Sequence, residues 1–340
     1  MRLASTLFLN TPGSRVSVER GALLVRSPDG SKERVPMESI DGVALFGGSS
    51  ISTEAAARCV AAGIRVASMT RSGRVRFVCS PPTSGNVHLR VAQVRLADDR
   101  ERSFAIAKSI VGGKIRNARR VALRWHESAD EPEKSMIGSV LDGLSNASGM
   151  VGASATGDHL RGVEGEAARR YFKALGAHVG VLGPPFSMPR RSRRPPADPL
   201  NAALSFGYGL LNAELIGAAD LVGLDPQIGF FHGIRSGRPS LALDLVEEMR
   251  APVIDRFVAR SLRRHQLRLE HFQETPGGGW YLTDDGRRNY LALFDEYRQR
   301  TTFHEALNQD VPVWSLPVLQ TTLMARHVRD DLSSYLPWAA

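Results

Sequence analysis

Short apolar runs, several of them alternating with polar residues, dominate the first 80 residues of the chain. Alternation with a period of two is typical of strands that bury one face. Asp29-Gly30 is a strong hairpin-turn signal between two of these runs. One segment breaks the pattern, because residues 53–62 have helical spacing and end at Gly63. We expect strands at 7–9, 16–18, 22–25, 35–37, 40–46, 64–69 and 75–78.

Helical spacing replaces the alternation beyond residue 88. Residues 81–88 precede it and form a linker by composition, since the stretch from Ser80 is rich in proline, serine and glycine. A long helix is expected over 89–124, with a bend at Gly112-Gly113. Further helices are expected at 136–144, 159–175, 201–219, 241–249 and 252–269.

Two segments of the second half have no helical pattern. Residues 183–199 are rich in proline and arginine, which predicts a loop, and the short apolar pieces after Pro312 could dock on the body or on a partner. The whole pattern predicts an α+β protein. A small β-rich domain (1–80) would precede a larger, all-helical domain (89–340).

Basic residues outnumber acidic ones. The chain has 44 Lys and Arg against 35 Asp and Glu, a formal net charge of +9. This surplus predicts a polyanionic partner, with nucleic acid the first candidate and a merely solubilising charge the alternative. The 89–124 helix carries ten Lys or Arg against three acidic residues, which favours a phosphate-facing surface over a solvated face. A second basic cluster lies in the proline-rich loop and consists of Arg190, Arg191, Arg193 and Arg194.

The two cysteines, Cys59 and Cys79, are too few for a disulfide framework or a zinc site. The first ten residues lack the apolar run of a signal peptide. No apolar run in the sequence is long enough to span a bilayer. We therefore expect a cytoplasmic protein.

The first candidate for chemistry is Glu164. At helical spacing it shares a stripe with Ala168 and Tyr171, which would turn a carboxylate toward the core. Such a carboxylate is costly to bury unless it is paired or bound to a metal. A buried ion pair, for example with Arg169, is therefore the alternative to a metal or catalytic role.

A histidine and three carboxylates are the other candidates. His232 ends an apolar run before a turn-rich segment, which favours a loop mouth over a core histidine. Asp244, Glu247 and Glu248 would share one helix face, where a divalent cation, arginines or plain solvation would relieve their repulsion. Mixed histidine and carboxylate ligands suit Mg²⁺ or Mn²⁺ in phosphodiester chemistry better than zinc. The sequence has no Walker A loop, no GxGxxG after a strand and no GxSxG elbow.

At these residues the sequence resembles the CRISPR-associated integrase, the DNA endonuclease that inserts new spacers into a CRISPR array. The order and spacing of the matching stretches are far more specific than any single motif, and the likeness covers nearly the whole chain. The stretches are Leu160-Arg161-Gly162-Val163-Glu164-Gly165 with Ala168-Arg169 and Tyr171-Phe172; Arg193-Arg194-Pro195-Pro196 with Asp198-Pro199 and Asn201; Leu204-Ser205-Phe206-Gly207-Tyr208; Gly229-Phe230-Phe231-His232; Ser240-Leu241-Ala242-Leu243-Asp244-Leu245 with Glu247 and Arg250; and, near the N-terminus, Gly42-Val43-Ala44-Leu45-Phe46-Gly47 and Gly85-Asn86-Val87.

The resemblance implies a metal site for Mg²⁺ or Mn²⁺. Its ligands would be Glu164, His232 and Glu247, where relatives also carry Asp in place of the last. Asp244 matches a second acidic residue of the family, close to the site and counted here with the catalytic residues. The implied reaction is a transesterification, in which the 3′-hydroxyl of a DNA fragment attacks a phosphodiester of the array.

The resemblance also implies partners. Two subunits would pair through their N-terminal β domains, and a small ferredoxin-like protein of the same adaptation module would bridge two dimers. Asn201 and Tyr208 match positions near the active site, where we expect them to contact DNA. Two other functions remain open: a branched-DNA nuclease without array specificity, and a DNA-binding scaffold without catalysis. Of these functions, the scaffold is the one that would not require the candidate ligands to lie close together.

Overall fold

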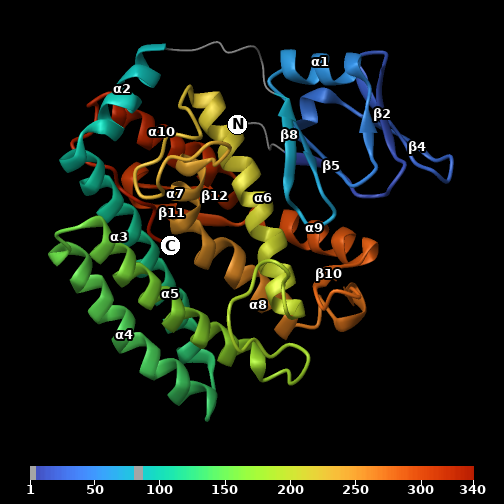
Figure 1. Ribbon diagram of the computed structural model, residues 1–340. Coiled ribbons are helices and arrows are strands. Elements are labelled where there is room, and N and C mark those ends of the chain that lie inside the picture. The colour runs from blue at the N-terminus through green and yellow to red at the C-terminus, as the bar shows by residue number, and fades with distance from the viewer. Residues whose placement is uncertain (1–4, 80–86) are drawn as a thin grey trace.

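Two four-stranded sheets make up the N-terminal part of the protein (Figure 1). The structure is a computed structural model that describes residues 5–79 and 87–340. The first sheet has the order β1-β5-β7-β8, with β8 antiparallel to β7 and the other pairs parallel. Its strands are β1 (Ser5–Leu9), β5 (Ile40–Phe46), β7 (Arg65–Met69) and β8 (Val75–Cys79). The second sheet is β4 (Lys32–Val35), β3 (Ala22–Arg26), β2 (Arg15–Glu19) and β6 (Ser50–Ile51), in that order.

The sheets enclose a small apolar core of their own. Val16, Leu23 and Val66 are buried there, and so is Cys59 from α1 (Thr53–Ala61). The Ser52 side chain accepts a hydrogen bond from the Ala55 amide and so caps the helix. Most strand and helix expectations for this part are confirmed. The strand expected at 35–37 is wrong beyond Val35, because Pro36 and Met37 lie after β4 at a short 3₁₀ turn, and β6 was not expected.

The second half is mostly helical, but the expectation that it is all-helical was wrong. Two short antiparallel hairpins interrupt the helices: β9 (Phe272–Glu274) with β10 (Trp280–Leu282), and β11 (Thr301–His304) with β12 (Gln309–Pro312). Its helices are α2 (Val87–Asp98), α3 (Arg100–Ser128), α4 (Glu133–Ala153), α5 (Gly157–Gly180), α6 (Pro199–Val222), α7 (Ser240–Met249), the π-helical η2 (Arg250–Asp255), α8 (Arg256–Arg263), α9 (Asp284–Arg298) and α10 (Leu316–Val328).

The expected long helix over 89–124 is two helices. The break falls between α2 and α3 at Asp99, whose carboxylate accepts hydrogen bonds from the amides of Glu101 and Arg102. An aspartate in this position satisfies the free N–H groups of a new first turn. Gly112-Gly113, where we expected a bend, lies inside α3. The expected linker lies mostly outside the described residues, which resume at Val87.

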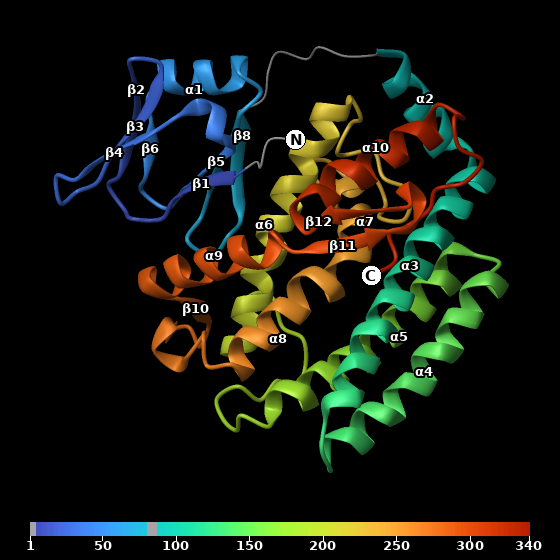
Figure 2. The ribbon, with the colours of Figure 1, turned by 180° about the vertical axis from the view of Figure 1, so that it is seen from behind.

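The helices of the second half are arranged as an outer layer on one flank and a central helix inside it. α3, α4 and α5 run side by side along one flank (Figures 1 and 2). The short helix α7 lies inside, in contact with α3, α6 and α10. Every residue of α7 except Leu243 is buried. Its carboxylates are consequently held in the interior of the protein. No helix of the described residues is long and apolar enough to cross a membrane.

The two halves meet at α6 and α9. Phe46 packs on Phe206 with ring centroids 5.7 Å apart. The turn between β7 and β8 touches α6 so closely that a Cβ on Gly209 would come within 2.2 Å of the Gly73 carbonyl oxygen. Only glycine permits this approach of two backbones. The Arg71–Val75 turn of the N-terminal part is thereby brought to the edge of the helical part.

Candidate functional site

Three carboxylates of α7 point to three different neighbours. Asp244, Glu247 and Glu248 are 0%, 3% and 1% exposed, which excludes plain solvation as the relief of their repulsion. A buried carboxylate needs partners to remain charged. Each of the three has its own set, and these partners separate their roles.

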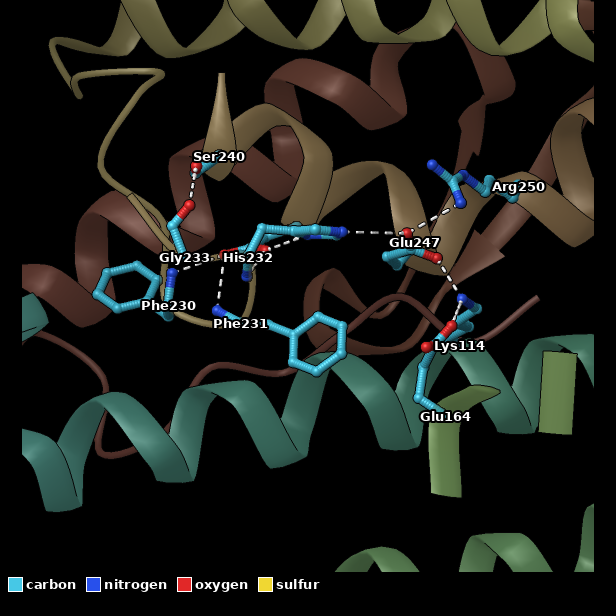
Figure 3. Close-up of polar contacts among 10 residues, drawn as sticks. Lys114, Glu164, Phe230, Phe231, His232, Gly233, Ser240, Glu247 and Arg250 are labelled. Atoms are coloured by element: carbon cyan, nitrogen blue, oxygen red, sulfur yellow. Dashed lines mark hydrogen bonds and ion pairs between the residues drawn. The ribbon is translucent and has the colours of Figure 1, made fainter. Parts of the chain in front are cut away.

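Glu247 is held as an anion by two cations. Its Oε1 lies 2.9 Å from Arg250 Nη1, and its Oε2 lies 2.7 Å from the Nζ of Lys114 on α3. Burial alone would raise the pKa of Glu247, but these cations outweigh it and lower the pKa to about 2. Glu164 on α5 is ion-paired with the same Lys114 ammonium (Figure 3). One cationic group thus connects two carboxylates from helices far apart in the sequence.

His232 faces the same place from the loop before α7. Its Nδ1 lies 2.7 Å from Asp244 Oδ1, and its Nε2 lies 3.9 Å from Glu247 Oε1 (Figure 3). Asp244 also accepts hydrogen bonds from three successive backbone amides, of Phe230, Phe231 and His232. With both its oxygens used in this way, Asp244 orients the histidine, and Nε2 is left to face Glu247.

The donor atoms of Glu164, Glu247 and His232 are of the types that a hard divalent cation prefers. In this structure, however, they are not close enough together to hold one. Among residues 5–79 and 87–340, no three His, Cys, Asp or Glu side chains are placed to hold a metal ion. The Lys114 ammonium lies between Glu164 and Glu247, where a cation is favoured. Glu247 Oε2 is buried and makes no hydrogen bond of regular geometry to the described residues. Glu164 and Glu247 supply carboxylate oxygens, among them the Oε2 of Glu247, and His232 supplies an oriented imidazole. Mg²⁺ and Mn²⁺ accept both of these ligand types.

An arginine-rich cleft of about 1180 Å³ opens beside this site. It shares Arg193, Tyr208 and Arg250 with a smaller cavity of about 60 Å³, which Glu164, Glu247 and Lys114 also line. No acidic side chain of the described residues lines the cleft. Its walls are suited to a polyanion. The arginines that line it are Arg71, Arg74, Arg191, Arg193, Arg194, Arg235, Arg238 and Arg250.

The loop arginines differ in orientation. Arg190, Arg193 and Arg194 are exposed, and the last two line the cleft. Arg191 turns inward, donates to Asn201 Oδ1 at 2.6 Å and to Ser205 Oγ at 3.0 Å, and lies over the Tyr208 ring. Its guanidinium therefore shapes the loop, and Arg193 and Arg194 are the better placed to meet phosphates.

Asn201 and Tyr208 are occupied inside the protein. Asn201 is fully buried, and its amide bonds to Asp198, Arg191 and two backbone groups of the loop. It has no polar group free for DNA, in contrast to our expectation of a direct contact. Tyr208 lines both cavities but donates its hydroxyl hydrogen bond to Asp255. Burial raises the pKa of Asp255 to about 6, against the lowering effect of that bond.

Lys114 and Arg250 are central to the site, and sequence reasoning did not assign them there. Lys114 is one of ten basic residues over 89–124, and nothing local distinguishes it from the others. Arg250 follows Glu247 at i+3, a spacing at which opposite charges pair on a helix, and that signal could have found it.

The family model for the CRISPR associated protein Cas1 matches residues 7–296. The chain belongs to the Cas1 family. A curated Cas1 relative, the CRISPR-associated endonuclease Cas1 2 of Rhodospirillum rubrum, is 40% identical over 344 residues, which cover 99% of this chain and 98% of that protein. The resemblance seen in the sequence is confirmed.

Solved structures related to this Cas1-family chain share its fold. A casposase bound to its integration product has a TM-score of 0.81 at 22% identity, covering 98% of this chain and 92% of that one. A chain of a Cas6-RT-Cas1–Cas2 complex also has a TM-score of 0.81 at 22% identity, covering 99% of this chain but 36% of its own length. These structures share the architecture of an N-terminal β-rich part and a mostly helical C-terminal part, and the expected α+β fold class is confirmed.

Proposed function

We propose that this Cas1-family protein is a metal-dependent DNA endonuclease and integrase that inserts spacer DNA into a CRISPR array. In this reaction a 3′-hydroxyl gives up its proton, and its oxygen forms a new bond to a phosphorus of the array. The bond from that phosphorus to the 3′-oxygen of the array strand breaks, and the leaving oxygen takes up a proton. Attack by water in place of the hydroxyl would make the same site a nuclease.

One observation carries the proposal: Glu164 and Glu247 share Lys114 and line a small cavity that adjoins the arginine-lined cleft, and His232 Nε2 faces Glu247. A scaffold that only binds DNA needs the arginines but has no use for a buried carboxylate that faces an oriented imidazole. The relative that is 40% identical is named an endonuclease, which supports an enzymatic function over a scaffold.

Each residue contributes a separate task to the proposed reaction. Arg193 and Arg194 would hold the phosphates of the strand, and the small cavity would limit the water that reaches the scissile bond. A bound Mg²⁺ or Mn²⁺ would neutralise charge that develops on the phosphate. Glu164, Glu247 and His232 would hold that ion, because their donor types fit it and Lys114 can turn aside on its flexible chain.

Partners belong to the proposal as well. Each spacer end needs its own strand transfer, so a homodimer would hold two active sites at a fixed distance. A small ferredoxin-like adaptation protein would bridge such dimers, and one of the similar solved structures is a complex named for both Cas1 and Cas2. The proposed place of action is the cytoplasm, where the array DNA lies.

The test is cleavage and integration of labelled DNA in Mn²⁺ by the wild type and by Glu164→Ala, His232→Ala and Glu247→Ala. Loss of a ligand removes both metal affinity and geometry, so each variant should lose about 100-fold or more of the rate. Glu166→Ala is the matched control, since Glu166 lies on the same helix but pairs with Arg169 and Arg170, which line neither cavity of the site. Near-wild-type activity of Glu164→Ala would refute the assignment.

An assay with an array substrate distinguishes the integrase from the two other candidate functions, a branched-DNA nuclease and a DNA-binding scaffold. Addition of the partner protein and a supercoiled array should give products joined at the array. Cleavage of branched DNA without joining would instead identify a nuclease that lacks array specificity. Binding without cleavage in any divalent metal would favour the scaffold.

A further inference from the structure

The last six residues of the structure, 335–340, form an irregular segment that is packed into the helical part. We call it the strap. Tyr335 and Trp338 are 2% and 4% exposed, whereas Leu336 between them is 52% exposed. In both ribbon views the C-terminal end lies beside α3 (Figures 1 and 2). The strap thus lies next to the helix that carries Lys114.

The first anchor of the strap is Glu248, the neighbour of Glu247 on α7. The Tyr335 hydroxyl donates to Glu248 Oε1 at 2.6 Å, and the Trp338 amide donates to Oε2 at 2.6 Å. Gln320 of α10 donates to the same carboxylate at 3.0 and 3.1 Å. Hydrogen bonds to a buried carboxylate are among the stronger ones in proteins. Two of these donors belong to the strap.

The second anchor is Asn117 on α3, one turn after Lys114. Its Nδ2 donates to the Glu248 carbonyl and to the Trp338 carbonyl, both at 2.8 Å, and its Oδ1 accepts from the Ala340 amide at 3.0 Å. This side chain is fully buried. A single amide therefore joins α3, α7 and the strap.

The strap also fills the space between these helices. Pro337 lies against Gly113, where a Cβ would come within 2.5 Å of it. The Trp338 indole N–H reaches the Phe303 carbonyl of β11 at 3.4 Å. Residues directly beside Lys114 in α3 and beside Glu247 in α7 are thus fixed by the same short segment.

We propose that the strap is a positioning element of the active site, which locks α7 against α3 and so sets how Glu247 faces Lys114 and Glu164. The strap makes hydrogen bonds with Glu248 and Asn117 and not with those side chains, so its effect acts through Glu248 and Asn117. The effect on catalysis rests on the proposed nuclease function. The locking of α7 does not rest on that function.

The test compares Tyr335→Phe and Trp338→Ala with the control Leu336→Ala in the full chain. Loss of a buried hydrogen bond or of the indole should raise amide hydrogen exchange in α7 about ten-fold, with no change in α4. In Mn²⁺ the same variants should lose about ten-fold in kcat, while KM for DNA stays within two-fold. Leu336→Ala should match the wild type in both measurements.

Unchanged exchange in α7 for both variants would overturn the proposal. Faster exchange with unchanged kcat would also overturn the positioning role, because the strap would then only stabilise the fold. If Trp338→Ala fails to fold, Tyr335→Phe decides, since it removes one oxygen atom and leaves the packing. A wild type that cuts no DNA would refute the proposed function, and the exchange measurement would still decide whether the strap locks α7.

Discussion

The three carboxylates of α7 lie within ten residues of one another, but each lies in a different environment because each contacts different partners. Backbone amides surround Asp244, cations surround Glu247, and neutral donors surround Glu248. Their spacing along the helix places the three carboxylates on one face, but it does not reveal that their roles differ. Their separate roles follow from the elements that pack around α7.

The role of Asp244 can be tested by Asp244→Asn. An amide cannot accept hydrogen bonds at both ends, so two of its four donors would face an N–H₂ group. We expect unfolding to become easier by about 1–3 kcal/mol and cleavage to slow by about 10–100-fold. Denaturant titration and single-turnover kinetics measure the two effects. Asp142→Asn, an exposed residue of α4, is the control, and a wild-type rate for Asp244→Asn would contradict its positioning role.

Glu248 makes stability depend on pH. Burial raises its pKa from 4.5 to about 7, although the bonds from Tyr335, Gln320 and Trp338 oppose the rise. The folded state then binds a proton that the unfolded state releases. The stabilisation is present below pH 4.5 and is lost as the pH rises toward about 7, by at most about 1.4 kcal/mol per pH unit.

Urea denaturation of the wild type and of Glu248→Gln over this pH range tests the dependence. The glutamine has no proton to lose, so its free energy of unfolding should fall less steeply with rising pH. The difference between the two curves isolates Glu248 from other titrating groups. Parallel curves would show that Glu248 titrates alike in the folded and unfolded states.

At the scale of elements, the sequence predicted most of the N-terminal strands but not the shortest strands or the break between α2 and α3. Period-two runs located strands such as β2, because Val16 and Val18 face a local core, whereas the central strand β5 is buried on both faces. β9 and β10, of three residues each, are too short to show any period, and the break at Asp99 depends on one capping side chain. Helical spacing and loop position singled out Glu164, His232 and Glu247 as candidates, and the family resemblance implied that they are the ligands. Lys114 was not singled out, because its role exists only where α3, α5 and α7 pack together.

The arginine loop 190–194 supplies a prediction for DNA binding. Arg193→Ala with Arg194→Ala should make the logarithmic dependence of affinity on salt shallower by about 0.9 for each phosphate that the protein no longer neutralises. Arg191→Ala should instead lower stability, since its guanidinium binds Asn201 and Ser205. Fluorescence anisotropy at several salt concentrations measures the slope. Arg58→Ala, on α1, is the control, and an unchanged slope for the double variant would move the phosphate track elsewhere.

At the scale of the whole molecule, the cleft draws on both halves. Arg71 and Arg74, beside the turn between β7 and β8, line it together with the arginine loop. From the sequence we expect residues 1–80 to assemble a dimer and residues 89–340 to hold the active site. The arginines beside the β7–β8 turn give the N-terminal part a place in the proposed DNA-binding surface as well, and its role in dimer formation stays a prediction.

That role can be tested at Phe77, which lies on β8 at the edge of the first sheet and is 51% exposed. An exposed aromatic residue on an unpaired edge is suited to contact with a second copy. We expect Phe77→Glu to shift the protein from dimer to monomer in light scattering at micromolar concentration. Phe303→Glu, equally exposed on β11, should leave the dimer intact. A dimer that survives Phe77→Glu would place the interface on another surface.

The contact of Gly113 with Pro337 couples two distant positions in their tolerance of mutation. Glycine inside a helix is about 1 kcal/mol less favourable than alanine. In the full chain, however, an alanine methyl at 113 would collide with Pro337. Gly113→Ala should therefore weaken the full chain and strengthen one that ends at Ser334. The effect of Gly113→Ala on stability thus has opposite signs in the two backgrounds, so a lineage that loses residues 335–340 could later gain stability from alanine at 113.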